Sequence, residues 1–136
     1  MATTTLPAQQ TAVALGIAFV VDCAVAEGYS SKRVAEIELA VEEALVNICR
    51  YAYPYRTGDV EVRCTRDEAQ QCVIEMIDTG EPFNLLTLPP PELTADLAQR
   101  PVGGLGVWLI RALVDDVAYR REGNCNILQL VIHPPG

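Results

Sequence analysis

The chain has 136 residues, of which 50% are hydrophobic and 21% are charged, with a formal net charge of −8 at pH 7. This length fits one ordinary domain, and the apolar content is high enough for a sizeable core, which excludes a disordered tail. The acidic balance excludes non-specific nucleic-acid binding and docking on anionic membranes, because both need basic surface. We therefore expect a single domain over residues 1–136 that binds small ligands and protein partners.

The five cysteines are odd in number and widely spaced, no CxxC pair occurs, and His133 is the only histidine. Neither a zinc site nor a secreted disulfide framework is expected, and this usage is typical of a reducing cytoplasm. Residues 12–21 are continuously apolar. A signal peptide requires a basic residue before its apolar stretch, but no Lys or Arg precedes Lys32. Asp22 ends the run well short of a bilayer span, so we expect a buried helix there.

The first predicted elements are a strand and two helices. Residues 3–6 are Thr-rich and are predicted to form an edge strand that Pro7 ends. Helix formers dominate residues 9–27, and Gly28 is predicted to terminate this helix.

The second helix is predicted to begin at a Ser30 or Ser31 cap and to run to about Ala52. Apolar residues recur along it at i, i+3/i+4 and i+7, which is the rhythm of a helix that faces a core. This stripe consists of Val34, Ile37, Val41, Leu45, Ile48 and Ala52.

Beyond this helix the apolar period changes to two, which predicts strands. The expected strands cover about residues 60–65, 72–77, 117–122 and 126–132. Residues 84–102 are Pro-rich and too long for a passive connector in so compact a domain, which favours a functional lid. A helix is expected over residues 105–114. The order β-α-α-β-β-lid-α-β-β predicts an α+β two-layer sandwich with helices packed on one face of a mixed β-sheet.

Glu43 and Asn47 are four residues apart and share one face of the second helix, opposite the apolar stripe on a helical wheel. Such a pair is commonly solvated surface. Its functional alternative places a carboxylate base beside an amide oxygen, which is a ligand for a hard cation.

Asp78, Thr79 and Gly80 follow a strand rich in apolar residues. Asp-x-Gly is commonly only a turn. An aspartate at a strand end beside apolar walls can also accept a hydrogen bond from an exocyclic amine, as recognition of adenine requires. The glycine would let the backbone approach the ring closely.

The segment Gly103-Gly104-Leu105-Gly106 opens a predicted helix. Glycines at this place can serve tight packing alone, but they also present N–H groups and the positive end of the helix dipole to phosphate. No Gly-Lys-Ser/Thr follows and no βαβ unit surrounds the segment, so it is neither a Walker loop nor a Rossmann fingerprint.

Taken in order, these segments resemble the N, G1 and G2 boxes of the GHKL ATPase superfamily, which has the Bergerat ATP-binding fold, and within it the anti-sigma factor serine/threonine kinases. The matching stretches are EEALVN (42–47), DTGEPF (78–83) and GGLGVWLI (103–110), and the resemblance spans roughly residues 3–132.

The resemblance implies that ATP and Mg²⁺ are the cofactors. It implies that Asn47 holds Mg²⁺, that Glu43 is the general base, and that Asp78 reads adenine with Gly80 beside it. The remaining nucleotide-binding residues that it implies are Phe83, Arg100, Gly103, Gly104, Leu105 and Gly106.

The resemblance also implies the partners. The acceptor would be a serine on an anti-sigma factor antagonist, a STAS-like protein, and the same kinase, expected to be a homodimer, would sequester a sigma factor. Phosphorylation would release the antagonist and free the kinase to hold sigma. Three alternatives stay open: a kinase-inactive, nucleotide-dependent regulatory binding module, the catalytic half of a histidine kinase, and a stand-alone ATPase.

Three departures from the family pattern bear on affinity and rate. Tyr51 stands where relatives often carry His. Residues 124–126 read Asn-Cys-Asn where relatives often carry a Thr that helps to fix adenine through a water. Arg100 is the only Lys or Arg between Phe83 and Gly103, so the expected lid carries little positive charge.

Overall fold

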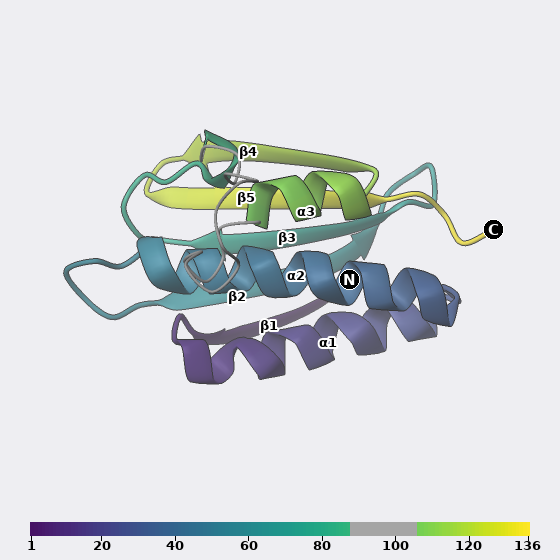
Figure 1. The fold of residues 1–136 in the computed structure, drawn as a ribbon. Coiled ribbons are helices and arrows are strands. Elements are labelled where there is room, and N and C mark those ends of the chain that lie inside the picture. Colours follow the sequence, from purple (N-terminus) through teal and green to yellow (C-terminus); the bar gives the residue numbers. More distant parts are fainter. Residues whose placement is uncertain (88–105) are drawn as a thin grey trace, which may run out of the picture.

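The computed structural model describes residues 1–87 and 106–136 (Figure 1). The strands are β1 Ala2–Pro7, β2 Asp59–Arg66, β3 Cys72–Asp78, β4 Asp116–Glu122 and β5 Cys125–Ile132. The helices are α1 Val13–Ala26, α2 Ser31–Tyr51 and α3 Gly106–Leu113, with short 3₁₀ helices at Gln10–Ala12 and Leu85–Thr87. Each strand and helix predicted from the sequence within the described ranges is confirmed to within a few residues.

The five strands form one sheet in the order β1-β2-β3-β5-β4, and the helices cover one of its faces (Figure 1). The α+β two-layer fold is therefore confirmed. The strand directions refine the expected mixed sheet, because all four pairings are antiparallel. Short turns join β2 to β3 and β4 to β5, and a short turn returns a chain antiparallel to itself. No helix in the described part of the chain is long and apolar enough to cross a membrane.

The ends of the long helices follow the sequence signals. Ser30 lies in an extended conformation before α2, and its side chain accepts a hydrogen bond from the Arg33 N–H at 3.2 Å. Gly28 has a φ of +95°, a left-handed conformation that favours glycine, and it follows the last turn of α1. The α1–α2 connection is therefore specified by local chemistry.

The burial of α2 differs from the helical-wheel expectation. Asn47 lies on the face expected to be polar, but its side chain is only 1% exposed. Ala40 and Ala44 are also buried on this flank. The reason is that α2 packs against both α1 and α3 and also shares the apolar core with the strands, so most of its circumference is covered. Only the Glu43 end of the predicted polar pair stays partly accessible.

Candidate functional site

A small cavity lies between α2 and the adjoining ends of β3, β4 and β5. Its apolar walls are Ile48, Met76, Phe83, Leu85 and Leu128. Three polar side chains also line it: Asp78, Tyr119 and Asn126. Apolar walls with a few converging polar groups are typical of small-molecule sites, but this cavity has a volume of only about 10 Å³, which is room for about one water, so a larger ligand requires it to open.

Asp78 is the charged group of this cavity, and it is only 4% exposed. Its Oδ1 accepts hydrogen bonds from the Gly80 N–H and from Asn126 Nδ2, both at 2.9 Å. Among the described residues, no hydrogen bond involves Oδ2. Burial raises the pKa of Asp78, while the bonds from Asn126 and Gly80 and the charge of Arg121 act in the opposite direction. The carboxylate thus keeps one oxygen available for a donor on a ligand.

Gly80 is required by packing in the loop that follows Asp78. A Cβ at this position would lie 2.1 Å from the carbonyl oxygen of Ala52. The next residue, Glu81, donates its N–H to the same oxygen at 2.8 Å. The glycine therefore lets the loop dock on the C-terminal end of α2, which fixes the position of Asp78 relative to the helix.

Asn126, which the sequence singled out only as a departure, proves to be a central residue of the cavity. It is 4% exposed and bonds to Asp78, Glu81, Phe83 and Tyr119. A signal for it exists in the sequence. It has the same strand parity as Leu128 and Leu130, so a period-two reading places a polar side chain on the core face of β5.

Glu43 and Asn47 lie one turn apart on α2, as predicted. Asn47 Nδ2 donates to the Glu43 carbonyl oxygen at 2.7 Å, which leaves its amide oxygen as an acceptor. Glu43 Oε2 is buried and has no hydrogen-bond partner among the described residues. Burial and the neighbouring charge of Glu42 raise the pKa of Glu43. A carboxylate in this setting favours taking up a proton.

The amide oxygen of Asn47 and the carboxylate of Glu43 are suitable ligands for a hard cation such as Mg²⁺, since amide and carboxylate oxygens are its usual protein ligands. Within the described ranges, no group of three or more His, Cys, Asp or Glu side chains could hold a metal ion. Mg²⁺ usually keeps few protein ligands and takes the rest from phosphate and water. The Asn47 oxygen therefore fits a cation that arrives together with a phosphate ligand.

Phe83, the last residue of the second motif, contributes an apolar wall and packs on Tyr51. The two ring centroids are 4.8 Å apart at an interplanar angle of 31°. Tyr51, one of the sequence departures, therefore joins the end of α2 to the loop after β3. Such an aromatic pair adds to the rigidity of the wall.

Part of the predicted site falls outside the described residues. Arg100, Gly103, Gly104 and Leu105 belong to this part, and Gly106 is the first residue of α3. Of the expected lid at 84–102, only residues 84–87 are described. The structure therefore shows two groups of the predicted site residues. Glu43 and Asn47 are neighbours on α2, and Asp78, Gly80 and Phe83 lie at or next to the cavity. The segment 103–106, expected to bind phosphate, stays a prediction.

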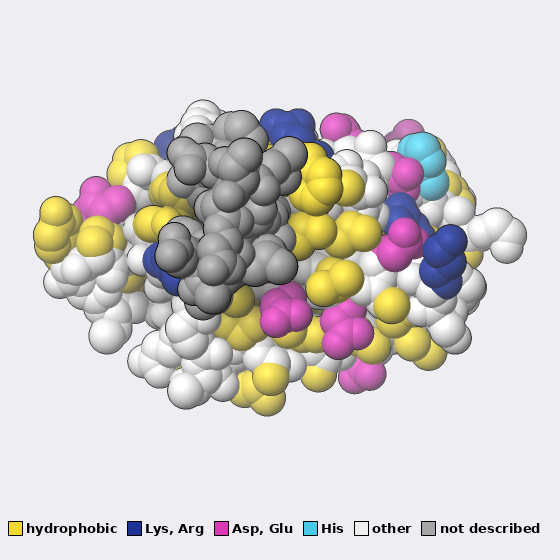
Figure 2. Space-filling view, in the orientation of Figure 1, with side chains coloured by type: hydrophobic (Ala, Val, Ile, Leu, Met, Phe, Trp, Pro, Cys, Tyr) yellow, Lys and Arg dark blue, Asp and Glu magenta, His cyan; other side chains and the backbone are white. Residues whose placement is uncertain are grey.

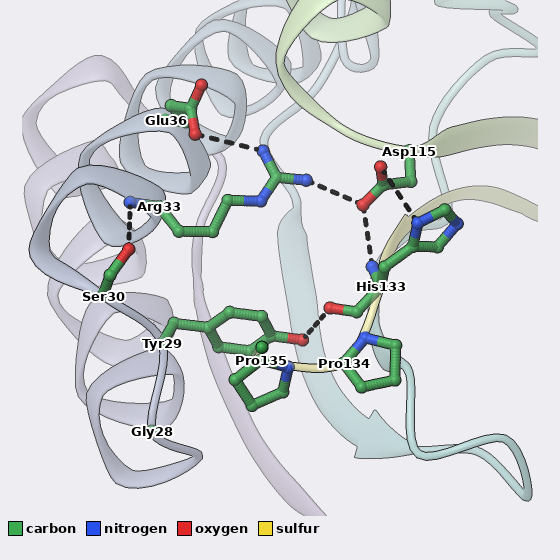
Figure 3. Close-up of a pocket in the computed structure, with 10 residues that line it drawn as sticks. Gly28, Tyr29, Ser30, Arg33, Glu36, Asp115, His133, Pro134 and Pro135 are labelled. Atoms are coloured by element: carbon green, nitrogen blue, oxygen red, sulfur yellow. Dashed lines mark hydrogen bonds and ion pairs between the residues drawn. The ribbon is translucent and has the colours of Figure 1, made fainter.

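A second, polar cavity lies at the opposite end of α2 (Figure 3). Arg33 extends into it and donates to the Leu113 carbonyl oxygen at 2.5 Å and to Asp115 Oδ2 at 2.7 Å. It also forms an ion pair with Glu36 at 3.4 Å. Because the guanidinium is already paired with two carboxylates, this cavity is poorly suited to bind phosphate. We interpret it as a clamp between α2, α3 and the last strand.

Asp115 is the centre of this clamp, so its replacement tests the clamp directly. It accepts a hydrogen bond from the His133 N–H at 2.7 Å besides the bond from Arg33. Partial burial alone would raise the pKa of Asp115, but these two partners outweigh it and hold the pKa below its usual value. We expect Asp115→Asn to lower the free energy of unfolding at pH 7 by about 1 kcal/mol.

The lowered pKa of Asp115 fixes the pH range of this effect. The stabilisation should be complete above the ordinary aspartate pKa of about 3.9 and should be lost as the pH falls through the lower pKa of the folded protein. Asp116→Asn is the matched control, because Asp116 is the next residue in the chain and its carboxylate accepts a hydrogen bond from the adjacent Val117 N–H instead of joining the clamp. Urea unfolding at pH 7 and pH 3 measures the difference, and equal losses in both variants would refute the clamp.

Comparison with known proteins places the chain in a family. Residues 6–132 match the family described as the histidine kinase-like ATPase domain. The serine-protein kinase RsbW of Listeria monocytogenes serotype 4a is 32% identical over 124 residues, which cover 87% of this chain and 78% of that protein. The chain belongs to the histidine kinase-like ATPase family, and proteins named serine-protein kinase RsbW are among its relatives. RsbW of Bacillus licheniformis is 35% identical over 107 residues, with 74% of this chain and 65% of that protein covered.

Solved structures agree on the fold. The structure of the RsbU and RsbW domains of a Mycobacterium tuberculosis protein matches with a TM-score of 0.66 at 15% identity, over 98% of this chain. The blue-light activated histidine kinase of Erythrobacter litoralis EL346 matches with a TM-score of 0.56 at 21% identity, over 78% of this chain. This histidine kinase-like domain spans 32% of the length of each of those chains. The GHKL resemblance drawn from the three motifs is confirmed by the family match over residues 6–132 and by the 32% identity to RsbW, and the solved structures agree with it in fold.

Proposed function

We propose that the chain is an ATP-binding serine/threonine protein kinase that phosphorylates a serine of a STAS-like antagonist protein and regulates a sigma factor by partner switching. The observation that carries this proposal is the 32% identity to a serine-protein kinase RsbW over 87% of the chain. The site geometry supports it, because an unpartnered carboxylate oxygen of Glu43 and an amide oxygen of Asn47 share one side of α2. A cytoplasmic location follows from the proposal.

ATP would supply the phosphoryl group, and Mg²⁺ would neutralise its charge, which is most of the catalytic requirement for phosphoryl transfer. In this proposal Asp78 would accept a hydrogen bond from the adenine amine, and Asn47 would hold the cation through its amide oxygen. Glu43 would take the proton of the serine hydroxyl while that oxygen bonds to the γ-phosphorus, and ADP would leave. The phosphate contacts would come from Arg100 and from the segment 103–106.

The proposed partners need accessible surface. The helix-bearing face exposes apolar side chains (Figure 2), and Trp108 of α3 is 56% exposed. At the other end of the layer, Leu15 and Val25 of α1 are 66% and 60% exposed, and β1 is an edge strand. Exposed apolar side chains beside an unpaired strand edge are suited to protein contacts. We propose that the α1–β1 side forms the homodimer.

The kinase proposal is tested by phosphoryl transfer from [γ-³²P]ATP to STAS-domain proteins of the same organism. The expected result is an acid-stable label on one serine, absent when that serine of the acceptor is replaced by alanine. An acid-labile label on this chain would instead support a histidine kinase. Bound ATP without any transfer to an antagonist would support a kinase-inactive regulatory module.

A further inference from the structure

Asn126 uses the whole hydrogen-bonding capacity of its side chain inside the cavity. Its Nδ2 donates to Asp78 Oδ1 at 2.9 Å and to the Glu81 carbonyl oxygen at 2.7 Å. Its Oδ1 accepts from the Phe83 N–H at 3.2 Å and from the Tyr119 hydroxyl at 2.6 Å. Two donors and two acceptor positions are all that a carboxamide has. One side chain thus ties the end of β3, the following loop and β4 to β5.

The consequence falls on Asp78. Its Oδ1 already receives two N–H donors, from Asn126 and Gly80, which fix the plane of the carboxylate. Both donors stabilise the ionised carboxylate, since an N–H bond to a charged oxygen is the stronger one. A ligand can therefore hydrogen-bond only to Oδ2. Because Oδ2 is an acceptor, it favours a ligand with an amine over a ligand with a carbonyl oxygen at that position.

The other groups around Asp78 do not supply this effect. Arg121 on β4 contributes positive charge, but its guanidinium donates to the Gly80 carbonyl oxygen at 2.9 Å. Tyr119 on β4 bonds to Asn126 rather than to Asp78. From α2 and β3 the cavity receives Ile48 and Met76, which are apolar. Asn126 is therefore the side chain that couples directly to the carboxylate.

We propose that Asn126 is a positioning and specificity-determining residue of the nucleotide site, which saturates Oδ1 of Asp78 so that only Oδ2 reads the exocyclic amine of the base. This inference rests on the proposed ATP binding. It assigns the selection of an amino-substituted purine to a pair, Asp78 with Asn126, and not to the aspartate alone. A purely structural role for Asn126 would instead affect stability without affecting the choice of base.

The test compares the affinities of Mg²⁺-ATP and of purine riboside 5′-triphosphate, which lacks only the amine. The variants Asn126→Thr and Asn126→Val are nearly equal in size, but threonine has a hydroxyl where valine has a methyl group. Only the threonine variant can therefore still donate a hydrogen bond to Asp78. Wild type is expected to prefer ATP by roughly tenfold at neutral pH, as for one hydrogen bond to a charged acceptor. Thr is expected to retain most of this preference, and Val is expected to lose most of it.

The pH dependence of the ATP preference is a second measurement, and a variant that only lost stability would not change it. The ATP preference should fall as the pH drops and Asp78 takes up a proton, and loss of the Asn126 donor should move this fall to higher pH. Using the ratio of the two nucleotides cancels ionisation of the phosphates. Asn124→Ala is the control, since Asn124 is an exposed asparagine two residues away that does not line the cavity, and it should leave the ratio unchanged.

A folded Asn126→Val variant with the wild-type preference and the wild-type pH profile would overturn the inference. If this variant does not fold, Asn126→Ala provides the same comparison. Failure of wild type to bind either nucleotide would instead remove the proposed function, so the two failures are distinguishable.

Discussion

Replacing Glu43 by glutamine is expected to slow phosphoryl transfer by about 10²–10⁴-fold, the usual contribution of a general base. Glutamine has nearly the same size but cannot take the proton of the acceptor hydroxyl. The affinity for Mg²⁺-ATP should change little, because Glu43 is not among the residues that line the cavity with Asp78. Stability should not suffer, because the variant removes a buried carboxylate oxygen that has no partner among the described residues. Single-turnover transfer of ³²P to the acceptor measures the rate.

Glu42→Gln is the matched control for this prediction. Glu42 precedes Glu43 in the helix, carries the same charge and is exposed. Its replacement should leave transfer within about threefold of the wild-type rate, the range of a small surface-charge effect. Equal transfer rates in wild type and the Glu43 variant would exclude Glu43 as the base, whereas the absence of transfer in both, with ATP still bound, would favour the regulatory-module alternative.

Replacing Asp78 by asparagine is expected to weaken ATP binding by about 10–100-fold. The asparagine would place its NH₂ group opposite the adenine amine, so that two hydrogen-bond donors face each other. An unsatisfied buried contact of this kind costs about 1–3 kcal/mol. The fold should persist, because the asparagine oxygen can still accept the bonds from the Gly80 N–H and Asn126. Isothermal titration calorimetry measures the affinity and circular dichroism the fold.

Asp59→Asn controls for the loss of one negative charge. Asp59 is an exposed residue at the start of β2, beside the strand that carries Asp78. It should bind ATP as wild type does. If Asp78→Asn retained wild-type affinity, the cavity at the end of β3 would not be the base site, and the proposed assignment of adenine to it would be wrong.

Local signals in the sequence predicted most of the elements, because the relevant interactions lie within a few residues. The Ser30 cap, the left-handed Gly28 and the period-two pattern of β2 are of this kind. The burial of Asn47 could not be predicted in this way, since it depends on α3 packing against the second flank of α2. A helical wheel describes a helix with one covered side, and α2 is covered on several.

The same distinction applies to the site. Glu43, Asn47 and Asp78 were identified through the spacing of their motifs, and the structure places them on α2 and at the end of β3. The role of Asn126 depends on a contact between β5 and β3 that spans 48 residues of sequence. Gly80 was interpreted as a close approach to the base, whereas the structure shows a close approach to Ala52. Both contacts are tertiary, although the period-two pattern of β5 already places Asn126 on the core face of that strand.

Calorimetric titration of the wild-type protein with ATP in the presence of Mg²⁺ shows whether this chain binds the nucleotide on which the proposed function depends. We predict saturable binding of one ATP per chain, weakened by Asp78→Asn and unchanged by Asp59→Asn. Absence of saturable binding to the folded wild-type protein, with and without a STAS-like partner, would contradict the proposed ATP-dependent function.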